Sequence, residues 1–179
     1  LMNNLMNPKY PKGRNLFKDK NILITAAAGS GIGFSTAKRF LEEGANIFIS
    51  DVHQGRLDDS IDDLRKLDLG KVNGCLCNVT KDEEIETMFK EAIACFSHLD
   101  GVINNAGLGG ESALENMTND AWDLVMDVTL NGAMKIMRAA IPLLKDTQGV
   151  IVNNASVLGW RAQAGQSHYA AAKLSLIHI

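Results

Sequence analysis

The sequence contains no run of about 18 apolar residues, the length that a membrane-spanning helix requires, so no such helix is expected. Its first 20 residues lack the apolar region and the A-x-A-like site of a signal peptide, so we expect no secretory signal. Basic residues are not in excess either. The net charge of −3 gives no global electrostatic reason to bind nucleic acid. With 46% hydrophobic and 22% charged residues over 179 positions, the composition is typical of one soluble globular domain.

Cysteine and histidine are scarce, and neither has the spacing of a disulfide framework or of a metal site. The three cysteines, Cys75, Cys77 and Cys95, are an odd number without disulfide spacing, which favours a reducing compartment and a cytoplasmic protein. Cys75 and Cys77 would share one face of a strand as small buried apolar residues. The four histidines show no metal-ligand spacing, so no metal site is predicted.

Short apolar runs alternate with helical patterns along most of the chain. Each run is continuously apolar, which is typical of strands buried on both faces, and the segments between them carry apolar residues at helical spacing. This order indicates an α/β fold with a doubly wound parallel sheet. We expect an irregular lead-in over 1–20 and a dinucleotide-binding, catalytic domain over 21–179. The expected strands are 21–25, 46–50, 72–76, 101–104 and 149–153.

Local signals predict several helix ends. Thr80 and Glu83 have the spacing of a capping box before the third helix. Thr118 is expected to cap the fourth helix, and Ser167 the last one. The first helix is expected to bury its apolar residues Ile32, Ala37, Phe40 and Leu41.

The first expected strand runs directly into a Gly-rich turn that opens a helix. Glycine lets the backbone approach a pyrophosphate, and the helix N-terminus attracts its negative charge. Asp51 closes the second strand, 18 residues past Gly33, where a carboxylate accepts hydrogen bonds from the adenosine ribose and repels a 2′-phosphate. The pattern therefore predicts NAD as cofactor, with NADP less favoured; the alternative interpretation of Asp51 is a strand-end turn residue. The cofactor-binding residues predicted in the turn are Ala27, Gly29, Ser30, Gly31, Ile32 and Gly33.

The stretch 153–173 carries three residues suited to proton transfer: Ser156, Tyr169 and Lys173. Tyr169 and Lys173 are four residues apart, so on a helix they share one face. A nearby ammonium favours the phenolate and lowers a tyrosine pKa from its usual value of about 10, which suits a general acid or base. Ser156 follows an apolar run and could donate a hydrogen bond to a reacting carbonyl. Taken alone, the Tyr–Lys pair also fits an exposed surface pair.

In combination these motifs resemble the short-chain dehydrogenase/reductase family, over Asn21 to Lys173. The resemblance implies a Rossmann fold that is incomplete at its C-terminal end, and an NAD(P)-dependent oxidoreductase. It rests on motifs in a fixed order: the turn TAAAGSGIG, the segment 104–107 (NNAG), Asn131 within VTLNG, and the set Ser156, Tyr169 and Lys173.

The resemblance also implies roles. Tyr169 would exchange a proton with the substrate oxygen, Lys173 would lower its pKa and bind the nicotinamide ribose, and Ser156 would polarise the carbonyl. Asn131 would position a water in the proton relay, at a kink in its helix. The other cofactor contacts that it implies are Asn105, Ala106 and Gly107 at the adenine-side ribose, and Asn78 with Val79 near the adenine.

Three features depart from the family pattern. Ala27 stands where the first turn glycine falls, and Asn78 stands where Asp is usual, so slightly weaker cofactor binding is expected. Family chains continue well past Lys173, whereas this one stops at Ile179. We therefore expect a truncated form whose last six residues come from a sequencing or assembly junction, and a homodimer or homotetramer for the full-length parent.

The expected reaction is hydride transfer between a nicotinamide cofactor and a small-molecule secondary alcohol or ketone, without nucleic-acid or membrane partners. The Gly-rich turn and the loop 155–163 look like those of bacterial enzymes of steroid-ring and acyl-CoA breakdown, in which Trp160 and Arg161 would rim the substrate pocket. The alternative enzyme is a 3-oxoacyl-thioester (acyl-carrier-protein) reductase. The alternative of another class is a nucleotide-binding fragment without turnover.

Overall fold

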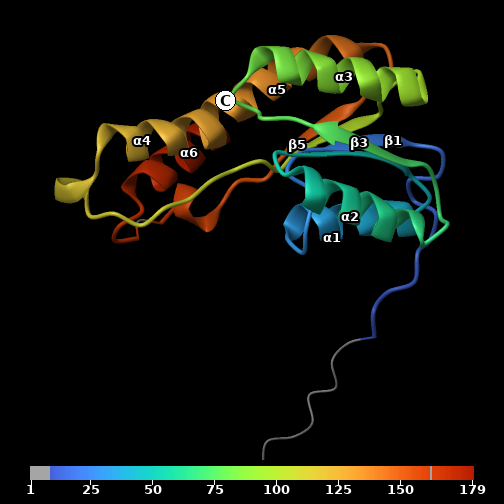
Figure 1. The fold of residues 1–179 in the computed structure, drawn as a ribbon, viewed down its shortest axis with the longest axis horizontal. Helices are drawn as coiled ribbons and strands as arrows, with labels where there is room; N and C mark the ends of the chain where they lie inside the picture. The colour runs from blue at the N-terminus through green and yellow to red at the C-terminus, as the bar shows by residue number, and fades with distance from the viewer. Residues whose placement is uncertain (1–8, 162) are drawn as a thin grey trace, which may run out of the picture.

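The computed structural model describes residues 9–161 and 163–179, and it confirms the predicted doubly wound α/β fold. Five parallel strands form one sheet in the order β3-β2-β1-β4-β5. Helices α1 and α2 cover one face of the sheet, α3 and α5 cover the other, and α4 lies beside α6 (Figure 1). The strands are β1 (Asn21–Ile24), β2 (Asn46–Asp51), β3 (Val72–Leu76), β4 (Gly101–Asn104) and β5 (Val150–Asn153). The helices are α1 (Ile32–Glu42), α2 (Gln54–Arg65), α3 (Asp82–Phe96), α4 (Asn119–Met126), α5 (Gly132–Lys145) and α6 (Ser167–His178).

Two hydrophobic cores explain why the strands are continuously apolar. Successive side chains of a strand point to opposite faces of the sheet. Leu23 and Phe48 enter the core beneath α3 and α5, whereas their neighbours Ile22, Ile24 and Ile47 enter the core beneath α1 and α2. Both faces of the inner strands are therefore buried, as the sequence pattern predicts.

The strand order reverses beside β1, because β2 follows on one side of β1 and β4 on the other. In open parallel sheets, ligands bind at such a point, outside the carboxyl ends of the strands. Thr25, Asp51 and Asn105 stand at or just after the carboxyl ends of β1, β2 and β4, and Asn154 follows β5. The fold thus brings the motif-bearing segments to one edge of the sheet.

Strand β5 forms one edge of the sheet and is the least buried strand. Val150 and Val152 are 61% and 50% exposed on one face, while Ile151 packs against the core on the other. In the described part of the chain, no helix is both long enough and apolar enough to cross a membrane.

Two of the predicted helix ends are wrong, and one is confirmed. Helix α3 begins at Asp82 with Lys81 as its N-cap, so Thr80 and Glu83 form no capping box. Instead Glu84 accepts a hydrogen bond from the backbone N–H of Asn78 at 2.7 Å. Ser167 is the first residue of α6, after the N-cap Gln166, and its hydroxyl makes no capping bond. The hydroxyl of Thr118 does cap α4, accepting from Ala121 N at 3.2 Å.

The burial predicted for α1 and for the cysteines holds in part. Ala37 and Leu41 are buried and Phe40 is half-buried, but Ile32, the first residue of α1, is 68% exposed. Cys77 is buried and Cys75 is half-buried. Burial raises the pKa of each of these two thiols to about 12, so both stay protonated near neutral pH.

A π-helical segment, η2 (Asp127–Asn131), joins α4 to α5. Such single-turn π segments are frequent at functional sites, because they change which side chains face a neighbouring element. The segment coincides with the kink expected at Asn131.

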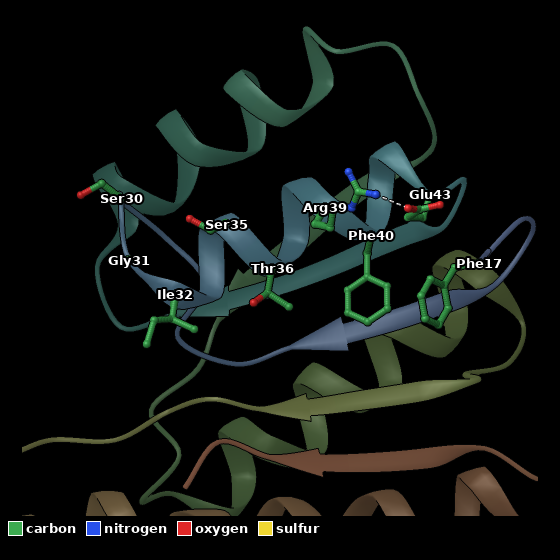
Figure 2. A pocket seen from close by; sticks show the side chains of 9 residues that line it. All are labelled: Phe17, Ser30, Gly31, Ile32, Ser35, Thr36, Arg39, Phe40 and Glu43. Carbon is green, nitrogen blue, oxygen red and sulfur yellow. Dashed lines mark hydrogen bonds and ion pairs between the residues drawn. The ribbon is translucent and has the colours of Figure 1, made fainter. Parts of the chain in front are cut away.

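The described part of the lead-in, residues 9–20, forms no helix or strand but is tied to the C-terminal end of α1. Residues 1–8 lie outside the described residues. The buried carboxylate of Glu43 accepts the backbone N–H groups of Arg14 at 2.7 Å and Leu16 at 3.2 Å, and it pairs with Arg39 (Figure 2). The hydrogen bond from Arg14 is the main cause that holds the pKa of Glu43 below its usual value. This carboxylate therefore fastens the lead-in to α1.

Replacing Glu43 with Gln should lower the free energy of unfolding at neutral pH, because a neutral amide cannot match the carboxylate as acceptor for Arg14, Leu16 and Arg39. The folded-state pKa lies below the ordinary value of 4.5, so the stabilisation is present above that pH and is lost as the pH falls through the folded pKa. Urea unfolding at pH 7 and in acid measures both effects. The gap between parent and variant should shrink in acid.

Glu86→Gln is the matched control, since this α3 carboxylate is exposed and only pairs with Lys90 at 3.7 Å. It should leave the urea midpoint nearly unchanged. Equal midpoints for the parent and Glu43→Gln at pH 7 would contradict the assignment.

Candidate active site

The Gly-rich turn after β1 is held by close backbone contacts. A Cβ added to Gly33 would lie 2.5 Å from the carbonyl oxygen of Ala26 and 2.7 Å from Nδ2 of Asn105, so only glycine fits there. Gly29 has φ of +84°, the left-handed region that glycine favours. These two glycines therefore set the path of the turn into α1.

The alanine that replaces the family's first turn glycine causes no steric conflict. Ala27 is fully buried, and its N–H donates to the carbonyl of Ser50 at 2.9 Å. The unusual conformation falls one residue earlier, on Ala26, whose φ is +49°. A left-handed alanine costs roughly 1–2 kcal/mol, so the turn carries some strain at Ala26 instead.

Another backbone group of the Gly-rich turn also makes a hydrogen bond within the protein. The N–H of Gly29 donates to the buried hydroxyl of Ser60 in α2 at 2.9 Å. Ser30, Gly31 and Ile32 follow at the start of α1, and Ile32 continues with Thr36 and Phe40 along one side of the helix toward Phe17 (Figure 2). These residues border a groove of about 630 Å³ along α1.

A separate cavity of about 410 Å³ opens at the carboxyl ends of β1 to β4. It contains the predicted cofactor residues Asp51, Asn78, Val79, Ala106 and Gly107. Its position at the strand-order reversal is the place where a dinucleotide-binding sheet holds its ligand. The structure thus brings together residues that lie far apart in the sequence.

Two of the predicted adenine-side contacts use their side chains within the protein. Oδ1 of Asn78 accepts both the N–H and the hydroxyl of Thr80, at 3.0 and 2.9 Å, so its amide nitrogen is the group left for a ligand. The side-chain amide of Asn105 points into the sheet edge instead of the cavity: it donates to the carbonyls of Thr25 at 3.1 Å and Ala26 at 2.9 Å. Their cofactor roles remain predictions.

Asn105 also begins a chain of hydrogen bonds that reaches Lys173. Oδ1 of Asn105 accepts from Nδ2 of Asn154 at 2.9 Å, and the carbonyl of Asn154 accepts from Nζ of Lys173 at 2.6 Å. The Gly-rich turn, β4, β5 and α6 are thereby linked through one polar path. Sequence reasoning missed Asn154, although its place directly after a strand and two residues before Ser156 is a signal that could have found it.

Lys173 and Tyr169 share one face of α6, as their spacing predicts. The Lys173 ammonium is 5.6 Å from the centre of the Tyr169 ring, and Lys173 as a whole is 3% exposed. Burial lowers the pKa of Lys173 below its ordinary value. A cation removed from water acts on neighbouring groups with little screening, and the Tyr169 side chain lies one helical turn away on the same face.

Ser156 stands at the start of the short 3-10 turn η3 (Val157–Gly159), which packs against α6. A Cβ on Gly159 would come within 3.2 Å of the Lys173 backbone, so glycine permits this close approach. The hydroxyl oxygen of Ser156 accepts from Leu158 N at 3.1 Å. Its hydrogen remains available for donation to a substrate oxygen.

Asn131, the fourth predicted catalytic residue, points its side chain elsewhere. It is exposed, and its amide donates to Asp127 one turn earlier at 2.7 Å. Thr129 faces the site instead: it is fully buried, and its hydroxyl accepts from the N–H and donates to the carbonyl of Leu108, both at 2.9 Å. A Cβ at Gly107 would lie 3.3 Å from Nζ of Lys173 and 3.9 Å from the Thr129 methyl group, so both side chains border this glycine.

Helical geometry explains this difference between Thr129 and Asn131. Residues two apart in a helix lie on opposite sides, so Thr129 and Asn131 cannot both face Lys173. The geometry of its side chain gives no support to a relay role for Asn131, which stays a prediction. Along the described chain, no group of three or more His, Cys, Asp or Glu side chains is placed to hold a metal ion.

A sequence model of the short chain dehydrogenase family matches residues 20–179. The chain belongs to this family. Short chain dehydrogenases are oxidoreductases that bind NAD(P), so the match confirms both the resemblance and the Rossmann-type sheet.

Individual members of the short chain dehydrogenase family agree with this assignment. A reductase from Mycobacterium tuberculosis, named (5R,7aS)-5-hydroxy-7a-methyl-1-oxo-2,3,5,6,7,7a-hexahydro-1H-indene-carboxyl-CoA reductase, is 46% identical over 180 residues, covering 99% of this chain and 69% of the relative. A 3-oxoacyl-[acyl-carrier-protein] reductase FabG from Thermotoga maritima is 35% identical, covering 88% of this chain and 64% of the relative. The crystal structure of a short chain dehydrogenase from Mycobacterium smegmatis superposes with a TM-score of 0.93 at 47% identity, covering 96% of this chain and 72% of that one. The chain therefore spans about two thirds of the length of the two curated relatives.

Thr129→Val should test the observed contact with Leu108. The substitution keeps the side-chain volume but leaves the Leu108 N–H and carbonyl without their partner, which we expect to cost about 1–3 kcal/mol of folding stability. Asn131→Ala should change stability by no more than about 0.5 kcal/mol, since it alters an exposed side chain. Urea unfolding and turnover of both variants provide the measurement. A large loss of turnover in Asn131→Ala at unchanged stability would restore the predicted relay role.

Proposed function

We propose that the protein transfers hydride between a nicotinamide cofactor and a secondary alcohol or ketone, with α6 as the catalytic element. The observation that carries the proposal is the buried Lys173 ammonium, held by the Asn154 carbonyl beside Tyr169. A lysine is rarely so deeply buried unless its charge has a partner or a task. Family membership supports the same reaction class.

The residues present fit a dinucleotide. Gly33 allows close packing of α1 on the strand, the cavity at the carboxyl ends of the strands contains Asp51 and Gly107, and the start of α1 provides a favourable site for phosphate. When bound, the cofactor supplies or accepts the hydride. We propose NAD for this role, since the carboxylate of Asp51 suits the hydroxyls of an adenosine ribose.

Three residues of this chain act in the transfer of the proton. Tyr169 gives its phenolic proton to the substrate oxygen during reduction and takes it back during oxidation. Lys173 stabilises the phenolate through its poorly hydrated charge and binds the nicotinamide ribose. Ser156 donates its free hydroxyl hydrogen to the substrate carbonyl, because its oxygen already accepts from Leu158 N.

For the substrate we propose the CoA thioester of a ring ketone from steroid breakdown. The Mycobacterium tuberculosis reductase named for an indene-carboxyl-CoA shares more of its sequence with this chain than the Thermotoga maritima FabG does. In this proposal Trp160, which is 82% exposed, and the exposed Arg161 rim the substrate. Ala162 lies outside the described residues. The second candidate, reduction of 3-oxoacyl thioesters on acyl carrier protein, uses the same catalytic groups.

The remaining features of the proposal concern the whole protein. We propose a cytoplasmic enzyme that assembles as a homodimer or homotetramer, with a domain over 21–179 preceded by the lead-in 1–20. Exposed apolar side chains on α5 and α6 support an association surface: Ile141, Leu174 and Ile177 are 48%, 46% and 37% exposed.

Tyr169→Phe should lower turnover of a ring-ketone CoA thioester with NADH by about 10²- to 10⁴-fold, the usual contribution of a positioned acid or base. NADH binding should be unchanged, because the variant removes a single hydroxyl from α6. Loss of absorbance of the reduced nicotinamide measures turnover, and calorimetry measures binding.

Tyr10→Phe is the matched control: it makes the same chemical change at an exposed tyrosine that donates to Glu42. It should leave turnover intact. A parent chain that binds NADH but turns over no ketone would favour the nucleotide-binding fragment, and full activity in Tyr169→Phe would refute the catalytic assignment.

A further inference from the structure

The loop after β4 runs along the start of α6, the helix that carries Tyr169. We call residues 108–112 the post-β4 loop. A Cβ added to Gly109 would lie 3.8 Å from Cδ2 of the Tyr169 ring. At the end of the loop, the N–H of Ser112 donates to the carbonyl of Gly165 at 2.9 Å. The post-β4 loop therefore lies directly beside the residue that is proposed to transfer the proton.

One buried side chain of α6, His168, contacts the middle of this loop. His168 directly precedes Tyr169 in the sequence and is 2% exposed. A Cβ added to Gly110 would lie 3.1 Å from Nε2 of His168, which is closer than an ordinary van der Waals contact. The φ of Gly110 is not positive, so the nearness of the imidazole, and not the backbone conformation, favours glycine at this position.

Hydrogen bonds anchor the post-β4 loop at both ends. The N–H and the carbonyl of Leu108 are both bonded to the buried hydroxyl of Thr129, each at 2.9 Å. At the other end, Ser112 is bonded to Gly165. Between these anchors lie two consecutive glycines, which have no side chain to pack against a neighbour. The ring of His168 supplies the packing at this point.

The imidazole of His168 acts on the loop through its shape. Its Nδ1 is buried and has no hydrogen-bond partner among the described protein atoms. A buried polar group without a partner is unfavourable, and an apolar group of the same shape in its place can be neutral or stabilising. The contact with Gly110 therefore depends on the volume of the ring and not on a hydrogen bond from Nδ1.

We propose that His168 is a positioning residue, whose ring sets the distance between the post-β4 loop and Tyr169 and thereby the width of the substrate side of the site. The inference rests on the proposed function, because the substrate is the ketone of that reaction. Without the ring, the loop moves into the space vacated beside Gly110, and the ketone is less well aligned with the Tyr169 hydroxyl. A misplacement of reacting groups by about 1 Å can cost roughly 100-fold in rate.

The first test removes or replaces the ring. His168→Ala should lower kcat/KM for a ring-ketone CoA thioester by about 10- to 100-fold, the effect expected of such a misplacement. NADH affinity, measured by calorimetry, should be unchanged, since His168 does not line the cofactor cavity. His168→Phe should retain most of the activity, because an apolar ring fills the same place.

A second substitution tests the contact itself. Gly110→Ala adds a methyl group against Nε2 of His168, so it should lower kcat/KM in the parent. In the His168→Ala background the methyl group has room, and the same substitution should have a smaller effect. Residues in contact show such coupling, of about 2- to 100-fold, whereas the effects of independent sites simply add.

Hydrogen exchange provides a readout that needs no turnover. In His168→Ala the Ser112 amide should exchange faster, because the loop opens more readily, whereas the Leu108 amide should stay protected by Thr129. His178→Ala is the matched control, since it makes the same chemical change in an exposed residue at the far end of α6. It should alter neither exchange nor turnover.

The outcomes separate the inference from the proposed function. A parent chain without turnover overturns the proposed function, and the exchange of the Ser112 amide then decides whether His168 holds the loop. Additive effects of His168→Ala and Gly110→Ala, or equal losses in His168→Ala and His168→Phe, overturn the role of the ring. If His168→Ala does not fold, Gly110→Ala alone should still speed exchange at Ser112, and an unchanged rate overturns the role. Rescue by His168→Phe together with coupling to Gly110 supports the proposal.

Discussion

The side-chain amide of Asn105 is the contact on which the site depends. Its nitrogen donates to the carbonyls of Thr25 and Ala26, and its oxygen accepts from Asn154. One planar group thus fixes the distance between the Gly-rich turn after β1 and the segment after β5 that holds Lys173. Asn105 is half-buried, and a side-chain amide whose nitrogen and oxygen are both hydrogen-bonded favours one arrangement, because any other leaves partners unsatisfied. The cofactor side and the proton-transfer side of the cleft are therefore parts of one rigid unit.

Burial of the Lys173 ammonium has a cost that the surrounding contacts offset. Removing an ammonium from water is unfavourable by roughly several kcal/mol in proteins. Here burial lowers the pKa of Lys173 below its ordinary value. The Asn154 carbonyl at 2.6 Å and the face of the Tyr169 ring recover part of this cost. What remains is a poorly hydrated positive charge one helical turn from the Tyr169 side chain.

The fold and much of the site could be predicted because their signals are local. Continuous apolar runs identify the strands, and spacing alone places Tyr169 and Lys173 on one face of a helix. Errors arose where the phase of a helix decides the outcome. Starting α3 at Asp82 makes Glu84 the carboxylate that accepts the Asn78 N–H. In the π-helical segment Thr129 borders Gly107 beside Lys173, and the relay role of Asn131 stays a prediction. The amide contacts of Asn105 join residues about 80 positions apart, so no local pattern reveals them.

The π-helical segment also has a consequence for the long helical rod that it interrupts. One residue of an α-helix corresponds to a rotation of about 100°, so the wider turn at Asp127–Asn131 changes the rotational phase between α4 and α5. This allows α5 to press its apolar side on the sheet while α4, on the same axis, presents a different side to α6. Deleting one residue there would restore α-helical hydrogen bonding but would rotate α4 relative to α5. Only one of the two packing contacts could then be kept, that of α5 on the sheet or that of α4 on α6.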